Sequence, residues 1–527
     1  MQDKEELTQA EKDKLKYGFD FDFKAIAERP LEDIPPGELV MYKWSGVYQQ
    51  LQKGFFMLRL RIPGGLLKST QLRTAGTLAE KHANSQLCVT TRQCLQFHWV
   101  RKEDLYKIME GMASVGILSK NACGDVTRNV VTCPLAGVCE HEVTDTTAML
   151  NAIANDPEML DYSRNLPRKH KISVAGCGRA CGLTLMNCQG WYPYNEDGAV
   201  FWKFHAGGGL GAKAFMAKAI FERVPSDLVV AVAKASCEVF NRLGNRQSRT
   251  RARLKFLVYD LGAEGYATEV MKVLREREVS GLERVVVGEH GVAVAKSYLR
   301  GQSTLTQKVP GLNVIRVMLK RGEFTSGDAA RLAKLAEQHG DGTVALTARQ
   351  NLVFHNVPDV SKQKLTAELK ESGYYLEGFE QVPDMVACVG STVCNLAVTD
   401  TTVTYRNLMD ALTSDERWWK DIGYLLIHIN GCPNSCGHQA IADIGLRGMR
   451  KKTDAGLEEG YTIFVGGTMM GEGCAAVPLC NVSGNLVASV VKAILNIYLE
   501  HRHSAAEPFS EFARRFGVTR FKEGLRG

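Results

Sequence analysis

The chain has 527 residues, too many for one hydrophobic core and typical of three or four domains. With 45% hydrophobic and 23% charged residues it has the composition of a globular protein, and no long apolar run predicts a membrane span. The net charge of +7 is mild and favours an anionic small molecule or an acidic protein over nucleic acid as the partner. Residues 1–21 mix both charges without an apolar core, so we expect no secretory signal and a cytoplasmic location.

The predicted elements alternate between strands and helices. Large apolar residues on alternate positions predict a strand at 55–62, three- and four-residue apolar spacing predicts a helix at 69–83, and 89–100 again has strand character. The same strand–helix–strand pattern returns near 313–357. Later expected elements are strands at 170–176 and 424–431 and helices at 226–243 and 486–502, with 244–262 joining the two parts. This order predicts an α+β fold.

An internal duplication accounts for the recurrence. Arg92 matches Arg349 and His98 matches His355, each at an offset of 257 residues. Downstream the offset becomes 255, and "VTDTT" occurs at both 143–147 and 398–402. One register that holds over so many positions indicates two copies of a unit of about 255 residues, related by pseudo-twofold symmetry.

Eight of the fifteen cysteines form two sets of four with the same spacing. Each set has a Cys-x5-Cys followed by a Cys-x3-Cys: Cys133, Cys139, Cys177 and Cys181 in the first copy, and Cys388, Cys394, Cys432 and Cys436 in the second. The odd count and the absence of an export signal argue against a disulfide framework. Four thiolates from two loops suit a cubane iron–sulfur cluster. A zinc site and buried free thiols are the alternatives, although structural zinc loops usually have shorter spacings.

The second set makes the sequence recognisable. "CVGSTVC" (388–394) and "NGCPNSCGHQAIADIGLRG" (430–448), together with "GDVTRNVVTCP" (124–134) and "NLPRKHKISV" (165–174), resemble the sulfite and nitrite reductases that contain sirohaem and a [4Fe–4S] cluster. The resemblance covers about residues 45–500. It implies a six-electron reduction of sulfite to sulfide or of nitrite to ammonia. It also implies that Cys436 both ligates the cluster and bridges it to the sirohaem iron.

The resemblance assigns further residues to the open face of the sirohaem. Four cations of the first half would bind the oxyanion and deliver protons: Arg59, Arg128, Lys169 and Lys171. The carboxylates of sirohaem would be held by Arg92 and Arg168, with Arg253 and Lys255 as further candidates. The active site would then form at the junction between the two halves. Because no flavin or nicotinamide module is recognisable, electrons would come from ferredoxin or a similar small carrier.

The substrate prediction favours sulfite. The Lys-x-Lys of "PRKHK" (167–171) resembles the sulfite reductases, and a second cation suits a more highly charged anion. In the opposite direction, "PLAG" followed by "VTDT" (134–146) resembles the nitrite branch, so nitrite stays as the alternative. A non-catalytic, cluster-binding electron-transfer subunit is the alternative of another class.

The first cysteine set departs from the familiar one-chain members, which lack it. Our hypothesis is a second [4Fe–4S] cluster; the alternative is a set of reduced, buried relics. The second half matches Arg59 with Arg316 but places other residues at the three remaining cation positions: Pro383, Tyr424 and Leu426. We therefore predict at most one working active site.

The predicted architecture combines these observations. It has two ferredoxin-like half-modules and two sirohaem- and cluster-binding α/β domains within the α+β class. The predicted bounds are an N-terminal extension (1–45), the first half-module (46–110), the first reductase domain (111–245), a linker that contacts the haem (246–312), the second half-module (313–365) and the second reductase domain (366–527).

Overall fold

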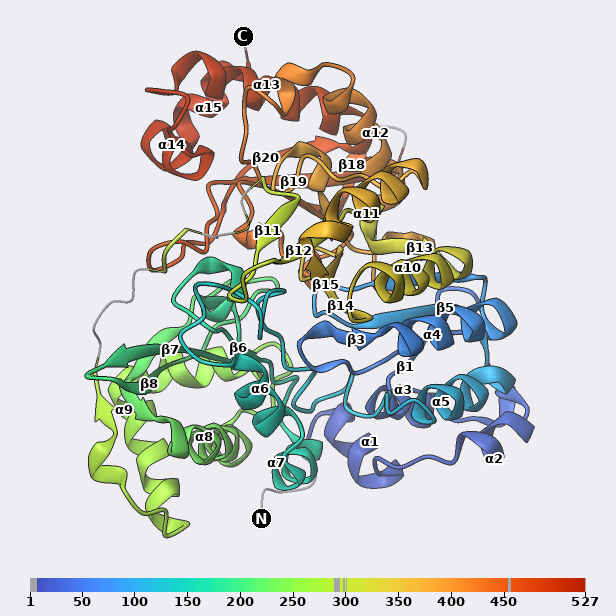
Figure 1. Cartoon of the computed structure of the whole chain (residues 1–527). Helices are drawn as coiled ribbons and strands as arrows, with labels where there is room; N and C mark the ends of the chain where they lie inside the picture. Colours follow the sequence, from blue (N-terminus) through green and yellow to red (C-terminus); the bar gives the residue numbers. More distant parts are fainter. Residues whose placement is uncertain (1–6, 289–293, 297–298, 300, 454–455, 527) are drawn as a thin grey trace.

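The structure is a computed structural model that describes residues 7–288, 294–296, 299, 301–453 and 456–526. Within these residues the strands form four sheets of five strands each. Two sheets belong to small helix-covered modules, and two belong to larger domains at opposite ends of the molecule (Figure 1). No helix in this part of the chain is long and apolar enough to span a membrane.

The first module is an antiparallel sheet packed against two helices. Its elements are β1 (Val47–Gln49), β2 (Phe55–Arg59), β4 (Gln86–Val89), β5 (Leu95–Arg101), α4 (Ser69–His82) and α5 (Leu105–Ala113). The predicted strand at 55–62 and helix at 69–83 are confirmed. The strand-like segment 89–100 is instead the turn and second strand of a hairpin, because Gln93 adopts a left-handed backbone (φ 55°) and reverses the chain.

The second module repeats the first at the predicted offset of 257. Its elements are β11 (Thr304–Thr306), β12 (Leu312–Val317), β14 (Thr343–Leu346), β15 (Leu352–Pro358), α10 (Ser326–His339) and α11 (Asp359–Glu371). The left-handed turn residue recurs as Gln350 (φ 64°). The duplication inferred from the sequence is therefore also a duplication of structure.

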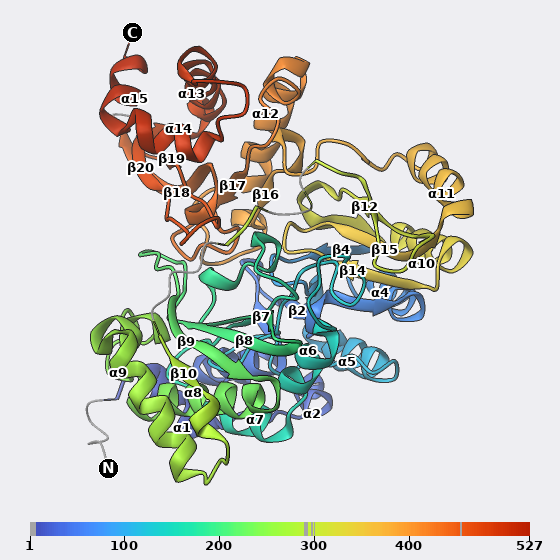
Figure 2. The ribbon, with the colours of Figure 1, turned by 60° about the vertical axis from the view of Figure 1, so that its left-hand side comes forward.

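The two modules exchange one strand each. β3 (Leu66–Lys68) pairs with β14 of the second module, and β13 (Glu323–Thr325) pairs with β4 of the first. The helices α4 and α10 also pack side by side, so closely that a Cβ on Gly76 would lie 2.7 Å from the Cβ of Ala329 (Figure 2). One hydrophobic core therefore spans both modules and fixes the two halves relative to each other.

The first large domain is a mixed sheet covered by helices. Its elements are β6 (Ile172–Val174), β7 (Gln189–Glu196), β8 (Ala199–Ala206), β9 (Lys218–Pro225), β10 (Val286–Val287), α6 (Thr146–Ala154), α7 (Pro157–Tyr162), α8 (Val229–Leu243) and α9 (Leu254–Glu276). The predicted helix at 226–243 is confirmed as α8. The segment 246–312 contains α9, which bends at Gly262 and packs on α8, so part of the expected linker belongs to this core.

The second large domain has the same arrangement. Its elements are β16 (Val386–Ala387), β17 (Ile427–Asn430), β18 (Ile444–Thr453), β19 (Gly456–Val465), β20 (Val477–Ser483), α12 (Thr401–Thr413), α13 (Val487–His501), α14 (Phe509–Phe516) and α15 (Val518–Gly524). The helix predicted at 486–502 is confirmed as α13. In both domains a short parallel pair, β6–β7 and β17–β18, precedes an antiparallel hairpin.

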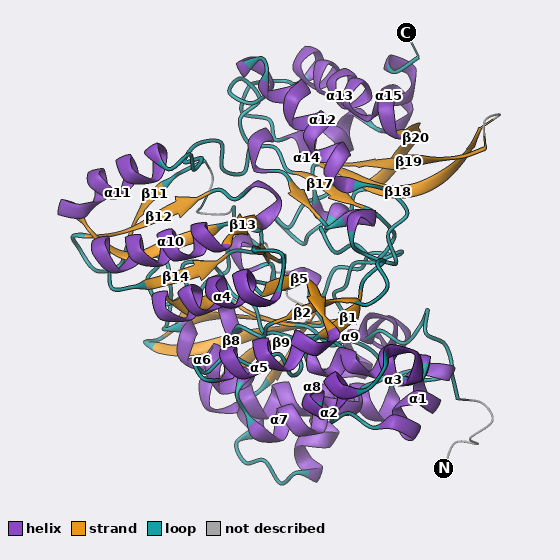
Figure 3. Ribbon diagram, turned by 90° about the vertical axis from the view of Figure 1, so that its right-hand side faces the viewer, coloured by secondary structure: helices purple, strands orange, loops and turns teal. Residues whose placement is uncertain are grey.

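The N-terminal extension folds onto the first half. It contains α1 (Gln9–Tyr17), α2 (Phe23–Glu28) and α3 (Pro36–Met41). The helix α2 packs beside α5, and Figure 3 places all three helices far from the C-terminal domain. Phe23 and Ile26 enter the core of the modules. The charged face of α1 instead lies against the first large domain.

Candidate functional site

The four thiols of the second half converge beside β16 and β17. Cys388 follows β16, Cys394 lies in the next loop, and Cys432 and Cys436 follow β17. Burial, and next the neighbouring Cys436, raise the pKa of the Cys388 thiol to about 12. The Gly431 N–H donates to the Cys388 sulfur at 3.1 Å, a contact that also stabilises a metal-bound thiolate. The chemistry of this set fits a cubane cluster.

Cations of the first half face this set across the junction. Arg59 ends β2, and Lys169 and Lys171 precede β6. Each of these three side chains lies within electrostatic range of Cys436. The Thr91 hydroxyl donates to the Cys436 carbonyl at 2.6 Å and closes the junction directly. The structure therefore brings together residues from the two halves that the sequence placed at one site.

The cations at this junction lack counter-ions within the described ranges. Among the described residues, none of Arg59, Arg128, Lys169 and Lys171 forms an ion pair, and the buried Nε of Arg59 has no acceptor. Arg128 donates only from Nε to the Gly124 carbonyl at 2.8 Å. Burying charges without partners is costly, so such a group of cations fits a bound polyanion. The carboxylates of a sirohaem and a small oxyanion meet that requirement.

Burial changes the acidity of the two lysines. Burial, and next the Arg253 guanidinium, lower the pKa of Lys169 to about 7. Burial, followed by Arg92, lowers the pKa of Lys171 well below its usual range. Each amine is therefore ready to release a proton unless an anion is bound beside it.

Two of the arginines predicted to hold sirohaem carboxylates have protein partners. Arg92 donates to the Asn187 side chain at 2.8 Å and to the Asn129 carbonyl at 2.5 Å, and its Nε stays without an acceptor. Arg168 pairs with Asp125 at 3.2 Å. These contacts hold together the loops that form the site. The cofactor role of Arg92 and Arg168 stays a prediction.

The remaining two candidates border the glycine-rich loop at 205–214. Lys255 donates to the carbonyls of Gly209 and Leu210 at 3.3 and 3.1 Å. A Cβ on Gly209 would lie 2.9 Å from an Arg253 nitrogen, so only glycine fits there without displacing the guanidinium. Arg253 otherwise donates to the Cys188 sulfur at 3.4 Å and keeps a buried Nε without an acceptor. Both cations are positioned by the loop, and neither has a carboxylate partner among the described residues.

The four thiols of the first half also converge. Cys133 contacts Cys181, and Cys139 lies within electrostatic range of Cys177 and Cys181. Burial raises the pKa of Cys139 to about 12. The surroundings of this set are apolar, with Leu135, Leu299, Leu305, Val314, Ala345 and Val353 packed against it. No group of three or more His, Cys, Asp or Glu side chains in the described ranges lies close enough to hold a single metal ion.

The image of the candidate site in the other half is neutralised. Arg316, the counterpart of Arg59, donates to Glu380 at 2.5 and 3.1 Å, and both side chains are about 5% exposed or less. Arg349, the counterpart of Arg92, pairs with Asp384 at 2.6 Å. A cavity of about 90 Å³ remains at this place, bordered by Cys181. This volume is far smaller than the 300–1,000 Å³ of typical ligand pockets.

The carboxylates that distinguish the two sites were not predicted from the sequence. Asp125 and Glu380 are equivalent at the offset of 255, and the structure confirms that register because the parallel bridges Val131–Ser173 and Val386–His428 correspond. Comparing the two copies residue by residue outside the cysteines would have singled out this pair. It would not have identified the partners of each carboxylate, which come from distant segments.

Comparison with known protein families gives two matches, each occurring twice. The model described as the nitrite and sulphite reductase 4Fe-4S domain matches residues 123–278 and 379–526. The model described as the nitrite/sulfite reductase ferredoxin-like half domain matches residues 48–115 and 305–372. The two pairs of matches follow the duplication seen in the sequence and in the sheets.

Individual relatives cover nearly the whole chain. An assimilatory ferredoxin-dependent nitrite reductase of Haloferax mediterranei is 32% identical over 94% of this chain and 89% of its own length. A ferredoxin sulfite reductase of Mycolicibacterium paratuberculosis is 29% identical over 97% of this chain and 96% of its own. The solved structure of the Mycobacterium tuberculosis NirA protein superposes with a TM-score of 0.86 at 25% identity, covering 98% of this chain and 97% of that one.

Proposed function

The chain belongs to the nitrite and sulfite reductase family, and from that premise we propose that it reduces sulfite to sulfide at the junction of its two halves. The observation that carries the proposal is the group of cations that faces Cys436 and has no counter-ion in the part of the chain that the structure describes: Arg59, Lys169 and Lys171. The excess of positive charge attracts a small oxyanion and holds it at the junction of the two halves. A non-catalytic electron-transfer subunit would have no need for these charges.

Each group of residues has its own part in the proposed reaction. Cys388, Cys394, Cys432 and Cys436 would hold the [4Fe–4S] cluster, and Cys436 would also bridge to sirohaem, which binds the substrate and passes electrons to it when present. Arg59 and Arg128 would bind the oxyanion through fixed guanidinium donors. Lys169 and Lys171 would stabilise its charge and supply protons as oxygen leaves as water.

Nitrite is the second candidate substrate. Its support is the 32% identity to the Haloferax nitrite reductase over 94% of the chain. Lys171 favours sulfite, because a second ammonium beside Lys169 suits the more highly charged anion. Steady-state reduction of both anions with one reduced artificial donor would decide between them. We expect a higher kcat/KM for sulfite; a higher value for nitrite would reverse the assignment, and no turnover of either would refute the proposed reaction.

Ferredoxin is the proposed electron donor. The net charge of +7 suits an acidic protein partner, and several relatives carry ferredoxin in their names. Turnover with reduced ferredoxin should fall steeply with added salt because docking is electrostatic. Turnover with a small uncharged electron donor should change little over the same range of salt concentration. If turnover with ferredoxin and turnover with the small donor depended equally on salt, electrostatic docking of ferredoxin would be contradicted.

A second [4Fe–4S] cluster is proposed for the first cysteine set. Its support is the convergence of Cys133, Cys139, Cys177 and Cys181 in apolar surroundings. Because the neighbouring image site has lost its free cations, this cluster would relay or store electrons. One cluster with one sirohaem contains five irons per chain, and two clusters with one sirohaem contain nine. An iron content near five, with one sirohaem bound, would refute the second cluster.

A further inference from the structure

The equivalent arginines of the two halves, Arg59 and Arg316, differ in whether a carboxylate is paired with them. Arg316 on β12 is neutralised by Glu380 at 2.5 and 3.1 Å, whereas Arg59 on β2 forms no ion pair among the described residues. A guanidinium already paired with a carboxylate has little left to offer an anion. The carboxylate equivalent to Glu380 in the first half is Asp125. Its position decides whether Arg59 stays available.

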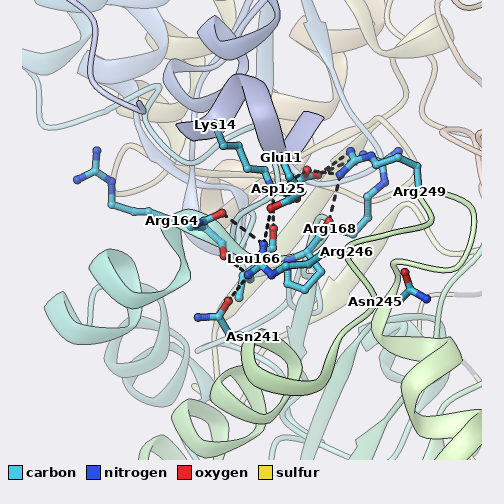
Figure 4. Close-up of polar contacts among 12 residues, drawn as sticks. Glu11, Lys14, Asp125, Arg164, Leu166, Arg168, Asn241, Asn245, Arg246 and Arg249 are labelled. Carbon is cyan, nitrogen blue, oxygen red and sulfur yellow. Dashed lines mark hydrogen bonds and ion pairs between the residues drawn. The ribbon is translucent and has the colours of Figure 1, made fainter. Parts of the chain in front are cut away.

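Asp125 is buried and is held by three other cations. Its carboxylate lies 2.7 Å from Arg249, 3.2 Å from Arg168 and 3.4 Å from Lys14, and its side chain is 4% exposed. Figure 4 shows these three side chains around it. Lys14 and Arg249 each come from a segment that is distant in the sequence. The carboxylate therefore has its charge satisfied without Arg59.

Lys14 comes from α1, and α1 contacts both loops that carry the proposed substrate cations. Besides Asp125, which precedes Arg128 by three residues, Lys14 donates to the Leu166 carbonyl at 2.8 Å, just before Lys169. The same helix is fixed by Arg246, which donates to Glu11 at 2.8 Å (Figure 4). The described residues between α9 and β12 contain no equivalent helix, so Glu380 has no such lysine.

Asp125 and Arg59 occupy positions equivalent to those of Glu380 and Arg316, which are in direct contact in the second half. Because both halves have the same fold, a carboxylate at this position can approach the arginine on β2. A carboxylate released from its cations in a buried site would be drawn to an unpaired guanidinium, because an unpaired buried charge is costly.

We propose that Asp125 is a positioning residue, and that its capture by Lys14 and Arg249 keeps Arg59 free to bind the oxyanion. This inference rests on the proposed function. It explains why Arg59 has no carboxylate partner in the described part of the chain whereas Arg316 has one, and it gives the N-terminal extension a role in substrate binding.

The test measures anion binding to the loaded protein from the change in sirohaem absorbance, with sulfite and nitrite each used as the probe, and steady-state turnover beside it. Lys14→Met should weaken binding and raise KM about tenfold, with a smaller change in kcat, since Asp125 is then held only by Arg249 and Arg168 and is freer to turn towards Arg59. Asp125→Glu should weaken binding similarly because the longer side chain reaches further. Lys12→Met, an exposed lysine on the same helix, is the matched control and should bind normally.

The decisive variant is the double substitution Lys14→Met with Asp125→Asn. It removes the carboxylate as well as its restraint, so binding should return to within about threefold of the unsubstituted protein. Arg249→Met with Asp125→Asn provides the same comparison if Lys14→Met does not fold. A double variant that binds as weakly as the single one, or a single variant with unchanged binding, would overturn the inference. Failure of the unsubstituted, loaded protein to bind either anion would overturn the proposed function and this inference together.

Discussion

Arg59 and Arg316 provide a matched pair of substitutions that separates catalysis from stability. The two arginines occupy equivalent positions on β2 and β12, but only Arg316 has a carboxylate partner in the described part of the chain. Each would be changed to methionine, which keeps the length of the side chain and removes its charge. Arg316→Met should then lose stability, and Arg59→Met should lose activity.

The magnitudes follow from the contacts of each arginine. Arg316→Met leaves Glu380 buried without its guanidinium, which costs about 3–5 kcal/mol for a buried pair. Arg59→Met breaks no ion pair, so its effect on stability should stay below about 1 kcal/mol. It does remove a charged hydrogen bond to the oxyanion, worth about 1.5–3 kcal/mol. That loss corresponds to a fall of roughly 10- to 150-fold in kcat/KM.

The assays are urea unfolding of the loaded protein and steady-state reduction of sulfite and nitrite. Arg316→Met should lower the unfolding midpoint clearly and, below that midpoint, keep kcat/KM within about threefold of the unsubstituted value. Arg59→Met should do the reverse. Loss of activity in both variants, or equal destabilisation by both, would refute the division between a working site and a neutralised image.

Three further predictions test other parts of the structure. Lys171→Asn should lower the ratio of sulfite to nitrite kcat/KM, and an unchanged or higher ratio would remove the reason for choosing sulfite. Cys181→Ser should reduce the iron content by up to four per chain while leaving the sirohaem absorbance in place, whereas Cys436→Ser should disturb both; unchanged iron in Cys181→Ser would contradict the second cluster. Burial, followed by Lys203, lowers the pKa of His205 to about 4, so the unfolded chain binds the extra proton and stability is lost as pH falls from about 6.5 towards 4. His205→Gln should flatten that pH dependence by up to about 3 kcal/mol in acid unfolding, and an identical slope would show that this histidine does not contribute.

The sequence by itself determined the duplication, most of the principal elements and the composition of the candidate site. Local sequence patterns predicted α4, α8 and α13 nearly to their ends. For α4 the pattern was the three- and four-residue spacing of apolar residues, which follows from burial of one face of a helix. The offset of 257 predicted that β12 would repeat β2. It also matched Arg316 with Arg59, and the offset of 255 identified the counterparts that had lost their charge.

Only the tertiary structure decided which partners these residues have. The exchange of β3 and β13 between modules depends on which sheet edges meet. The sequence of neither strand indicates which strand it will pair with. Likewise, nothing near Asp125 in the sequence indicates that Lys14 and Arg249 hold it, since they lie 111 residues before it and 124 residues after it. Local patterns record whether a side chain is buried. Which charged group contacts that side chain depends on how the chain packs. In this protein that packing gives Arg316 a carboxylate partner and gives Arg59 none among the described residues.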